Sequence, residues 1–503
     1  MPGGAAEVPP LDEADARQGA PRDASAHRLS APDENRARVV ARLGLSASEA
    51  RDLVAALRPA PGASGVHDED DAPEVIARCT WTGIAEPGDR VAGAVVGVLG
   101  AAGALAVVVD AWPAEAVVGA MTDAGLVLTD DARDALADEV RAALDRWRPR
   151  LVRAEAAARM HAARTVGARV LLPGDPDWPV GADDLGPHAP LVLWCTGHEG
   201  ALAALARSVA IVGARAATGY GEHVTAELAS GLAERDVVVV SGGAYGIDGA
   251  AHRASVATGG RTVAFLAGGV DRLYPSGHTE LFSRMRQHGA IVSELPCGAS
   301  PTRWRFLLRN RLIAAVSAAT VVVEAGARSG SLNTANHALA LERPLGAVPG
   351  PITSVSSSGC HRLLRESGAV CITSADDVME LVPGWGRSTE GPSDRTSASE
   401  TGVAARRPAS TDASRGVPSG RGASSPGAEA ASPAPSPGTG REDDPRVTRV
   451  LDALSVRRAR ETPDVAARAG LGTAETSSVL GRLELEGLAA RPDGGWVRRP
   501  SAR

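Results

Sequence analysis

The residues with the clearest potential for chemistry lie in a glycine-rich segment that follows an apolar run. Residues 209–212 have the composition of a buried β-strand, and Gly213, Arg215 and Thr218 come directly after them. Backbone N–H groups in such turns bind anions, and an arginine can hold a phosphate through two hydrogen bonds. The segment therefore predicts a phosphate contact, although a glycine after a strand is also ordinary turn chemistry.

A second glycine-rich loop follows the next apolar run. It contains Ser241, Gly242 and Gly243, and the serine hydroxyl is a further hydrogen-bond donor for a phosphate. Asp248 and His252 lie four residues apart and so share one face of the helix that follows. They could form a catalytic acid–base pair. We favour the simpler interpretation that the aspartate accepts hydrogen bonds from N–H groups at the start of this helix.

The third segment, residues 303–311, contains four arginines together with Trp304, Phe306 and Asn310, and it ends at Arg311. Arginines for phosphates and aromatic rings for stacked bases are what a groove for single-stranded nucleic acid requires. Neither a core helix nor a simple solvated face explains this mixture easily. The alternative is a buried aromatic anchor beside structural arginine–carboxylate pairs.

Two arginines test the groove interpretation most directly. We expect Arg215 to lie in a loop that faces the ligand, and Arg309 to begin a helix at the same edge, so that neither is needed for the fold. A structural Arg309 would instead pair with Glu294 or Glu324, the two acids that end apolar runs.

A fourth loop follows the apolar run that ends at Glu324. It is built from glycine, serine and arginine, and Asn333 and Thr334 begin the helix after it. Across the four segments we predict DNA or phosphate contacts and neither a catalytic residue nor a metal ligand. The predicted contact residues are Gly213, Arg215, Thr218, Ser241, Gly242, Gly243, Arg309, Asn310, Arg311, Asn333 and Thr334.

The elements that must position these residues alternate between strand-like and helical segments. Such alternation is typical of a parallel β-sheet with helices on both faces, in which ligands bind at the carboxyl ends of the strands. The sequence therefore predicts an α/β fold with an extended Rossmann-like parallel sheet core over residues 166–384. The expected strands are 168–172, 191–195, 208–213, 237–241, 262–266, 290–294, 319–324 and 344–347.

The flanks of this core have different compositions. Residues 34–165 have helical periodicity and predict an N-terminal helical domain, while residues 1–33 resemble a disordered tail. Residues 385–443 are rich in Ser, Pro, Gly and Ala, which indicates a disordered linker. Residues 444–500 regain apolar periodicity and predict three helices with a small β wing, a winged-helix domain.

One apolar run, residues 91–109, reaches membrane-spanning length. Ten of its 19 residues are Gly or Ala, so we expect a buried helix rather than a span. The N-terminus lacks a basic-then-apolar signal pattern, and the five cysteines form no closely spaced pair. We therefore expect a soluble cytoplasmic protein with no membrane partner and no metal site.

The charge distribution bears on polyanion binding. The chain has no lysine, so all 53 basic residues are arginines, and its net charge of −7 argues weakly against a generic nucleic-acid binder. Residues 303–365, however, hold eight arginines and two acids. A local positive zone matters more for nucleic-acid binding than the total charge does.

Taken in order, these motifs resemble the DprA/Smf family over about residues 168–382. The match includes Ser241-Gly-Gly, the Arg-Asn-Arg run at 309–311 and the Ser-Gly-Ser-Leu-Asn-Thr-Ala run at 329–335. The resemblance implies an extended Rossmann domain that binds single-stranded DNA, forms a homodimer and loads a RecA-type recombinase in natural transformation and recombination, with no cofactor. Leu307 and Leu308 depart from the family, since many members have proline and a basic residue there.

A nucleotide-processing enzyme is the main rival. The core also resembles, more distantly, phosphoribohydrolases that cleave nucleoside monophosphates and that carry a Pro-Gly-Gly-x-Gly-Thr-x-x-Glu loop. Here the corresponding strand end reads Glu-Ala-Gly-Ala-Arg-Ser-Gly-Ser from residue 324, without the terminal glutamate. A dinucleotide-binding oxidoreductase would need a Gly-x-Gly-x-x-Gly motif after the first strand, and that motif is absent from its expected place.

Overall fold

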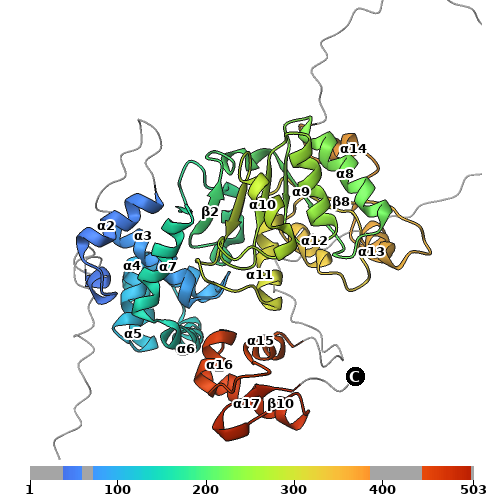
Figure 1. Ribbon diagram of the computed structural model, residues 1–503. Coiled ribbons are helices and arrows are strands. Elements are labelled where there is room, and N and C mark those ends of the chain that lie inside the picture. Colours follow the sequence, from blue (N-terminus) through green and yellow to red (C-terminus); the bar gives the residue numbers. More distant parts are fainter. Residues whose placement is uncertain (1–37, 59–71, 386–443, 500–503) are drawn as a thin grey trace, which may run out of the picture. The chain divides into compact units, whose positions relative to one another are not determined.

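The computed structural model describes residues 38–58, 72–385 and 444–499. The expected tail at 1–33 and the linker at 385–443 lie outside these residues except for residue 385. Within them, an N-terminal group of helices adjoins a large α/β core, and a small helical module lies at the C-terminal end of the chain (Figure 1).

The α/β core is built on a nine-stranded sheet in the order β1-β2-β6-β5-β4-β3-β7-β8-β9. The seven strands from β6 to β9 run parallel, whereas β2 pairs antiparallel with β6, and β1 with β2. The strands are β1 (Arg169–Leu171), β2 (Leu193–Gly197), β3 (Ser208–Val212), β4 (Val238–Ser241), β5 (Thr262–Phe265), β6 (Ala290–Ser293), β7 (Ala319–Val322), β8 (Leu345–Ala347) and β9 (Val370–Cys371).

This sheet confirms the predicted fold class. All eight expected strands are present, and β9 was missed because two exposed residues give too short an apolar run to recognise. β3 has β4 on one side and β7 on the other, so the chain reverses its direction of winding at β3. Such a switch point opens a crevice at the carboxyl ends of the two strands, where ligands bind in this class of fold.

Helices cover both faces of the sheet, because alternate residues of its central strands point to opposite sides. Val209, Ile211 and Val239 pack on one face, and Ala210 and Val212 pack on the other. The first face is covered by α8 (Gly219–Ala233), α9 (Ile247–Ala257) and α14 (Ala375–Leu381), and the second by α11 (Arg303–Ala315), α12 (Ser331–Ala340) and α13 (Ser358–Glu366). A further helix, α10 (Thr279–Met285), precedes β6.

The N-terminal helices share one hydrophobic core with the edge of the sheet. Trp81, Leu105 and Trp147 lie in the same buried cluster as Trp194 of β2. This continuity makes the helical region and the α/β core one packed body. The helices are α2 (Ala47–Leu57), α3 (Ala72–Ile84), α4 (Arg90–Val109), α5 (Ala114–Asp123), α6 (Asp130–Trp147) and α7 (Arg153–Thr165).

Helix α4 contains the long apolar run, and by length and composition it is the one helix among the described residues that could cross a membrane. It is broken at Gly100, which has φ of +71°, a conformation that favours glycine. The carboxylate of Glu74 accepts hydrogen bonds from the N–H groups of Ala101 and Ala102 at 3.0 and 3.1 Å. A charged cap inside the run and burial of most of the helix fit the expected core helix.

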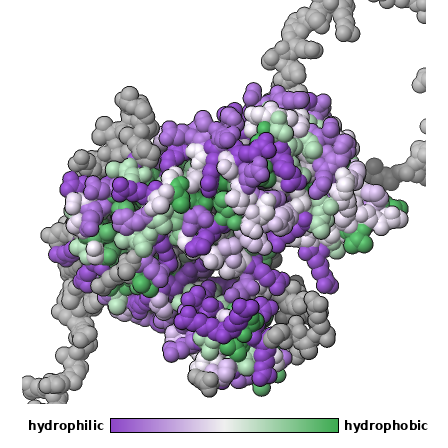
Figure 2. All heavy atoms as spheres, in the orientation of Figure 1, coloured by the Kyte–Doolittle hydropathy of each residue, from purple (hydrophilic) through white to green (hydrophobic). Residues whose placement is uncertain are grey.

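The C-terminal module has its own core, in which Val450, Val465, Leu480 and Trp496 are buried. Three helices and a two-stranded sheet make it the predicted winged helix. Its elements are α15 (Pro445–Ala453), α16 (Thr462–Ala469), α17 (Thr473–Leu485), β10 (Ala489–Ala490) and β11 (Val497–Arg498). Figure 2 shows that the visible face of the whole molecule is mostly hydrophilic, with apolar side chains in separate patches.

Candidate nucleic-acid interface

A cleft of about 660 Å³ lies at the carboxyl ends of β3 and β7, where the crevice is expected. Its walls come from the loop after β3, the first half of α11 and the loop between β7 and α12. Five of the predicted contact residues line it, namely Gly213, Arg215, Arg309, Asn310 and Thr334. The topology therefore brings predicted contact residues from three of the four sequence segments together, and Asp248 of the second segment also lines the cleft.

Arg215 lies on the rim of this cleft and is exposed. Its guanidinium lies 4.8 Å from the centre of the Phe306 ring. It forms no salt bridge with any carboxylate among the described residues, so its hydrogen-bonding groups remain available to a ligand. The backbone at the start of this loop is closely packed, because a Cβ on Gly213 would lie 2.5 Å from the side chain of Ile247.

Arg309 has a different position from the expected one. Helix α11 begins at Arg303, because the Thr302 hydroxyl accepts a hydrogen bond from the N–H of Arg305, and so Arg309 lies in the middle of the helix. Its side chain is 6% exposed and donates to the carbonyl oxygens of Gly242, at 2.7 Å, and Phe265. The expectation that Arg309 begins a helix is therefore wrong, and its burial argues against the expectation that the fold does not need it.

Burial sets the protonation behaviour around Arg309. Burial lowers the pKa of the Arg309 guanidinium to about 10, while the nearby Asp248 carboxylate acts in the opposite direction. Burial likewise raises the pKa of Asp248, and the positive charge of Arg309 opposes that rise. At neutral pH Arg309 thus remains a cation at the floor of the cleft.

Asn310 links the helix to the opposite wall of the cleft. Its amide nitrogen donates to Asn333 Oδ1 at 3.2 Å and to the carbonyl of Gly330 at 3.3 Å, and its oxygen accepts from Arg309 Nε at 3.2 Å. Thr334 lines the cleft but is only 1% exposed. These amides hold the loop before α12 against α11, so their effect on a ligand is to fix the width of the cleft.

Arg311 points away from the cleft, toward the N-terminal helices. Its guanidinium pairs with Glu294 at 2.8 Å and donates to the carbonyl of His188 at 2.9 Å, and the N–H of Gly88 donates to the same Glu294. The side chain is almost fully buried. Within the Arg-Asn-Arg run, the alternative of structural arginine–carboxylate pairing therefore describes Arg311, with Glu294 as its partner.

Thr218 and Glu324 form a hydrogen-bonded pair below the first loop. The Thr218 hydroxyl donates to Glu324 Oε1 at 2.6 Å, its N–H donates to Oε2 at 2.9 Å, and Ser356 adds a third bond at 3.1 Å. Thr218 also accepts from Gly221 and so caps α8. Thr218 is exposed, but its hydroxyl and its N–H are already engaged in these hydrogen bonds.

Polar groups of the second glycine loop are likewise engaged in hydrogen bonds within the protein. Ser241 is buried and donates to the carbonyl of Ile211 at 2.7 Å. The N–H of Gly242 donates to Asp248 at 3.1 Å, and Gly243 has φ of +68° with Phe282 packed against it. The protein's own carboxylate thus occupies the Gly242 N–H that the sequence suggested for a phosphate.

His252 does not face Asp248 as an acid–base pair would. Its Nδ1 lies 2.7 Å from the hydroxyl of Thr262, and the ring is fully buried. Burial lowers the pKa of His252 to about 3, and His278 and Arg309 add to the effect. Asp248, in the first turn of α9, accepts hydrogen bonds from the N–H groups of Gly242 and Ala244 in the preceding loop, whereas the sequence had suggested N–H groups of the helix itself.

Comparisons with known proteins follow the same division of the chain. A family model for DNA recombination-mediator protein A matches residues 169–383, and one for the DprA winged helix domain matches residues 430–495. The DNA processing protein DprA of Mycobacterium tuberculosis H37Rv is 45% identical over 342 residues, which cover 66% of this chain and 77% of that protein. The chain belongs to the DprA family. The family predicted from the motifs is thereby confirmed.

Two solved structures of DprA proteins are also similar. DNA processing protein A from Streptococcus pneumoniae matches with a TM-score of 0.46 and 26% identity, covering 61% of this chain and 97% of that one. A structure described as showing the single-stranded DNA binding mode of DNA processing protein A from Helicobacter pylori matches with a TM-score of 0.38 and 29% identity. It covers 42% of this chain and 93% of that one.

Exposed tyrosines at this edge of the DprA core were not among the contact residues predicted from the sequence. The chain has three tyrosines, and Tyr220, Tyr245 and Tyr274 are 44%, 51% and 49% exposed. Tyr274 lies 5.6 Å from the Phe306 ring, and Tyr245 packs on His278. In a chain with 3% aromatic residues, their position next to glycine or proline was the available signal.

Proposed function

We propose that this chain binds single-stranded DNA along the cleft at the carboxyl ends of β3 and β7. The observation that carries the proposal is the combination of exposed Arg215, half-buried Phe306 and exposed Tyr274 at this edge. Arg215 stacks on Phe306, and Tyr274 approaches the same ring at 5.6 Å. Single-strand sites combine positive charges that follow the backbone with rings on which bases stack, and they need no base-specific contacts.

Two exposed arginines that line the cleft would hold the backbone. Arg215 comes from the loop after β3 and Arg328 from the loop after β7, and both line the cleft and are exposed. Arg309 adds a buried positive charge beneath them. A backbone that follows this line passes Phe306, so its bases can stack there while the phosphates meet the guanidinium groups.

We further infer that the chain acts by binding and not by catalysis. Glu324, the acid that a nucleotide-cleaving enzyme would use at this strand end, already accepts three hydrogen bonds from Thr218 and Ser356. A nucleotide-cleaving enzyme would be recognised by a different assay. Release of a base from nucleoside monophosphates that is lost in Glu324→Gln would favour it over a binding protein.

The remaining parts of the proposal concern partners. Membership of a recombination-mediator family supports a role in delivering single strands to a RecA-type recombinase in the cytoplasm. A homodimer is consistent with the edge strand β9, whose two residues are exposed and whose outer backbone groups can pair with a second strand. Light scattering of the purified chain, with and without a RecA-type protein, tests both partners.

The binding proposal is tested by fluorescence anisotropy with a mixed-sequence single strand across a salt series. We expect log affinity to fall linearly with log salt, since arginines displace counterions from phosphates. Phe306→Leu keeps an apolar side chain but removes the ring, and it should cost about 1 kcal/mol or more, or roughly fivefold to tenfold in affinity. Failure to bind the single strand, or affinity that does not change in Phe306→Leu, would contradict the proposal.

A further inference from the structure

The winged-helix module has an uneven distribution of charge. The segments 454–460 and 488–499 together hold six arginines and one acid, Asp493. Helix α17, which occupies the place of a recognition helix, holds one arginine and two acids. The positive charge of the module is therefore concentrated away from α17.

The two arginine-rich segments are joined into one surface by backbone hydrogen bonds. Arg460 and Trp496 form an antiparallel bridge, with N–H to carbonyl distances of 3.0 and 2.7 Å. The N–H of Arg498 donates to the carbonyl of Ser455 at 3.0 Å. Segment 454–460 thus runs beside β11 and extends the small sheet, and we call this combined surface the wing face.

Five arginines of the wing face are exposed, namely Arg457, Arg458, Arg491, Arg498 and Arg499. None of them forms a salt bridge with a carboxylate of the described residues. Other arginines of the module form salt bridges. Arg446 and Arg482 pair with Asp444 at 3.1 and 2.8 Å, and Arg468 pairs with Asp464 at 2.8 Å.

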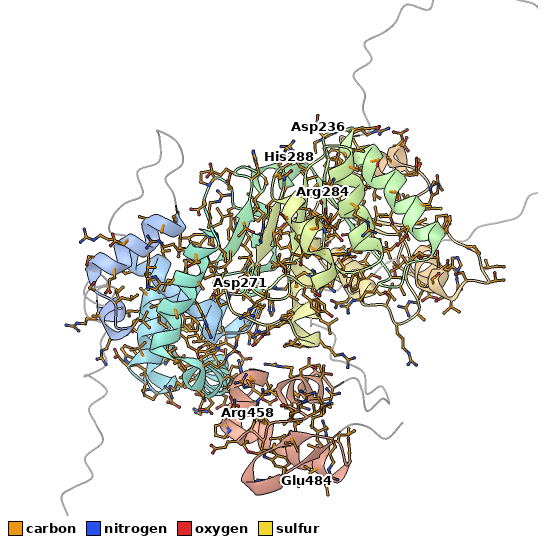
Figure 3. The ribbon with its side chains drawn as sticks, viewed as in Figure 1. Asp236, Asp271, Arg284, His288, Arg458 and Glu484 are labelled. Atoms are coloured by element: carbon orange, nitrogen blue, oxygen red, sulfur yellow. The ribbon has the colours of Figure 1, made fainter. Side chains whose placement is uncertain are left out.

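Helix α17 offers little to a phosphate. Its exposed positions include Thr473, Ala474, Ser477 and Ser478, and its one arginine is paired. Its last turn includes exposed Glu484, which lies apart from Arg458 of the wing face in Figure 3. An exposed acid on the helix that would enter a groove repels a polyanion.

From these contrasts we infer that the wing face, and not α17, binds the sugar–phosphate backbone of double-stranded DNA without reading its sequence. Single-strand sites present exposed rings for stacking, but Trp496 is only 6% exposed, and its indole N–H donates to Thr462 at 3.1 Å. Arginines without exposed rings suit a duplex, whose bases stay stacked and whose phosphates are regularly spaced. This second DNA site is separate from the cleft and does not depend on it.

The test uses the full chain and two variants of equal charge. The wing variant carries Arg457→Gln, Arg458→Gln and Arg498→Gln, and the matched control carries Arg446→Gln, Arg468→Gln and Arg482→Gln. Anisotropy with a mixed-sequence duplex should show at least about tenfold weaker binding for the wing variant and a salt slope reduced by up to about three. Binding of the matching single strand should not change, and the control should bind the duplex as the natural chain does.

Three outcomes would overturn the inference: unchanged duplex binding by the wing variant, an equal loss in the control, or an equal loss for single strands. Thermal melts establish that both variants are folded. A third variant, Arg215→Ala, separates the two sites, because it should weaken single-strand binding and leave duplex binding intact. If Arg215→Ala does not weaken single-strand binding, that result contradicts the cleft site and does not contradict duplex binding by the wing face.

Discussion

At the scale of residues, Arg215 offers the cleanest test of the cleft. Because it is exposed and forms no salt bridge with a described carboxylate, Arg215→Ala should leave the melting temperature unchanged. A charge-assisted hydrogen bond contributes about 1.5–3 kcal/mol, so single-strand affinity should fall roughly tenfold or more. The matched control is Arg284→Ala, which removes an exposed arginine of α10 that does not line the cleft (Figure 3). Equal losses of single-strand affinity in the two variants would mean that the effect comes from the net charge of the protein and not from a contact in the cleft.

Arg309 should behave in the opposite way. Arg309→Ala leaves the carbonyls of Gly242 and Phe265 without their donor and removes the cation beside buried Asp248. Each buried acceptor left unsatisfied costs about 1–3 kcal/mol, so the free energy of unfolding should fall measurably in chemical denaturation. Any loss of DNA binding would then be secondary to the damaged floor of the cleft. A variant as stable as the natural chain would contradict this structural role.

The sequence predicted that these residues lie near one another, but it could not predict which of them face solvent and which support the fold. Gly213, Arg215, Arg309, Asn310 and Thr334 meet at the cleft because carboxyl ends of parallel strands share one edge. Whether a given arginine faces solvent or a carbonyl depends on its phase within α11. The sequence predicted a helix that begins at residue 309, but α11 begins at residue 303, and this shift makes Arg309 a buried residue instead of one that faces the ligand. Composition alone defines cap positions poorly.

At the scale of elements, α4 depends on a contact that is distant in sequence. Glu74 caps the second half of this helix after the break at Gly100 and also accepts from Arg78 at 3.1 Å. Because an N-terminal cap contributes roughly 0.5–2 kcal/mol, Glu74→Ala should lower the free energy of unfolding by about that amount. Chemical denaturation of the variant beside the natural chain measures this. A helix that runs continuously through residue 100 would show no loss.

The break in α4 also marks a limit of pattern reading. Residues 91–109 contain no polar side chain, so nothing within the run indicates where it bends. Several glycines occur in it, and the one that adopts a positive φ is selected by a carboxylate from another helix. Strands were easier to predict, since buried parallel strands appear directly as short Val- and Ile-rich runs.

At the scale of the whole molecule, buried ion pairs connect the N-terminal helices to the α/β core. Glu86 pairs with Arg305 of α11 at 2.9 Å and with Arg150 at 2.8 Å. Glu294, the partner of Arg311 within the core, accepts a hydrogen bond from the N–H of Gly88 in the N-terminal region at 3.1 Å. Two of the four arginines in segment 303–311 thus join parts of the molecule instead of facing DNA. The composition of the segment predicted a single groove, because the sequence does not show that successive turns of α11 face different neighbours.

This arrangement predicts how the molecule responds to acid. Burial alone would raise the pKa of Glu86, but Arg305 and Arg150 lower it from 4.5 to about 2. A carboxylate with a lowered pKa in the folded state contributes stability above its unfolded pKa, and that contribution is lost as the pH falls from 4.5 toward 2. The full contribution is about 3 kcal/mol, and Glu86→Gln should therefore be less stable at neutral pH and converge with the natural chain in acid.

Chemical denaturation at a series of pH values measures the difference between the two chains. Glu139→Gln is the matched control, because Glu139 pairs with Arg90 at the surface, where both side chains are 47% exposed. Such exposed pairs contribute little, so this variant should follow the natural chain at every pH. A constant gap between Glu86→Gln and the natural chain, with no convergence below pH 4.5, would mean that Glu86 supports the fold through packing and not through its charge. Convergence would identify the Glu86–Arg305–Arg150 cluster as the electrostatic link by which the helical region is held on the α/β core.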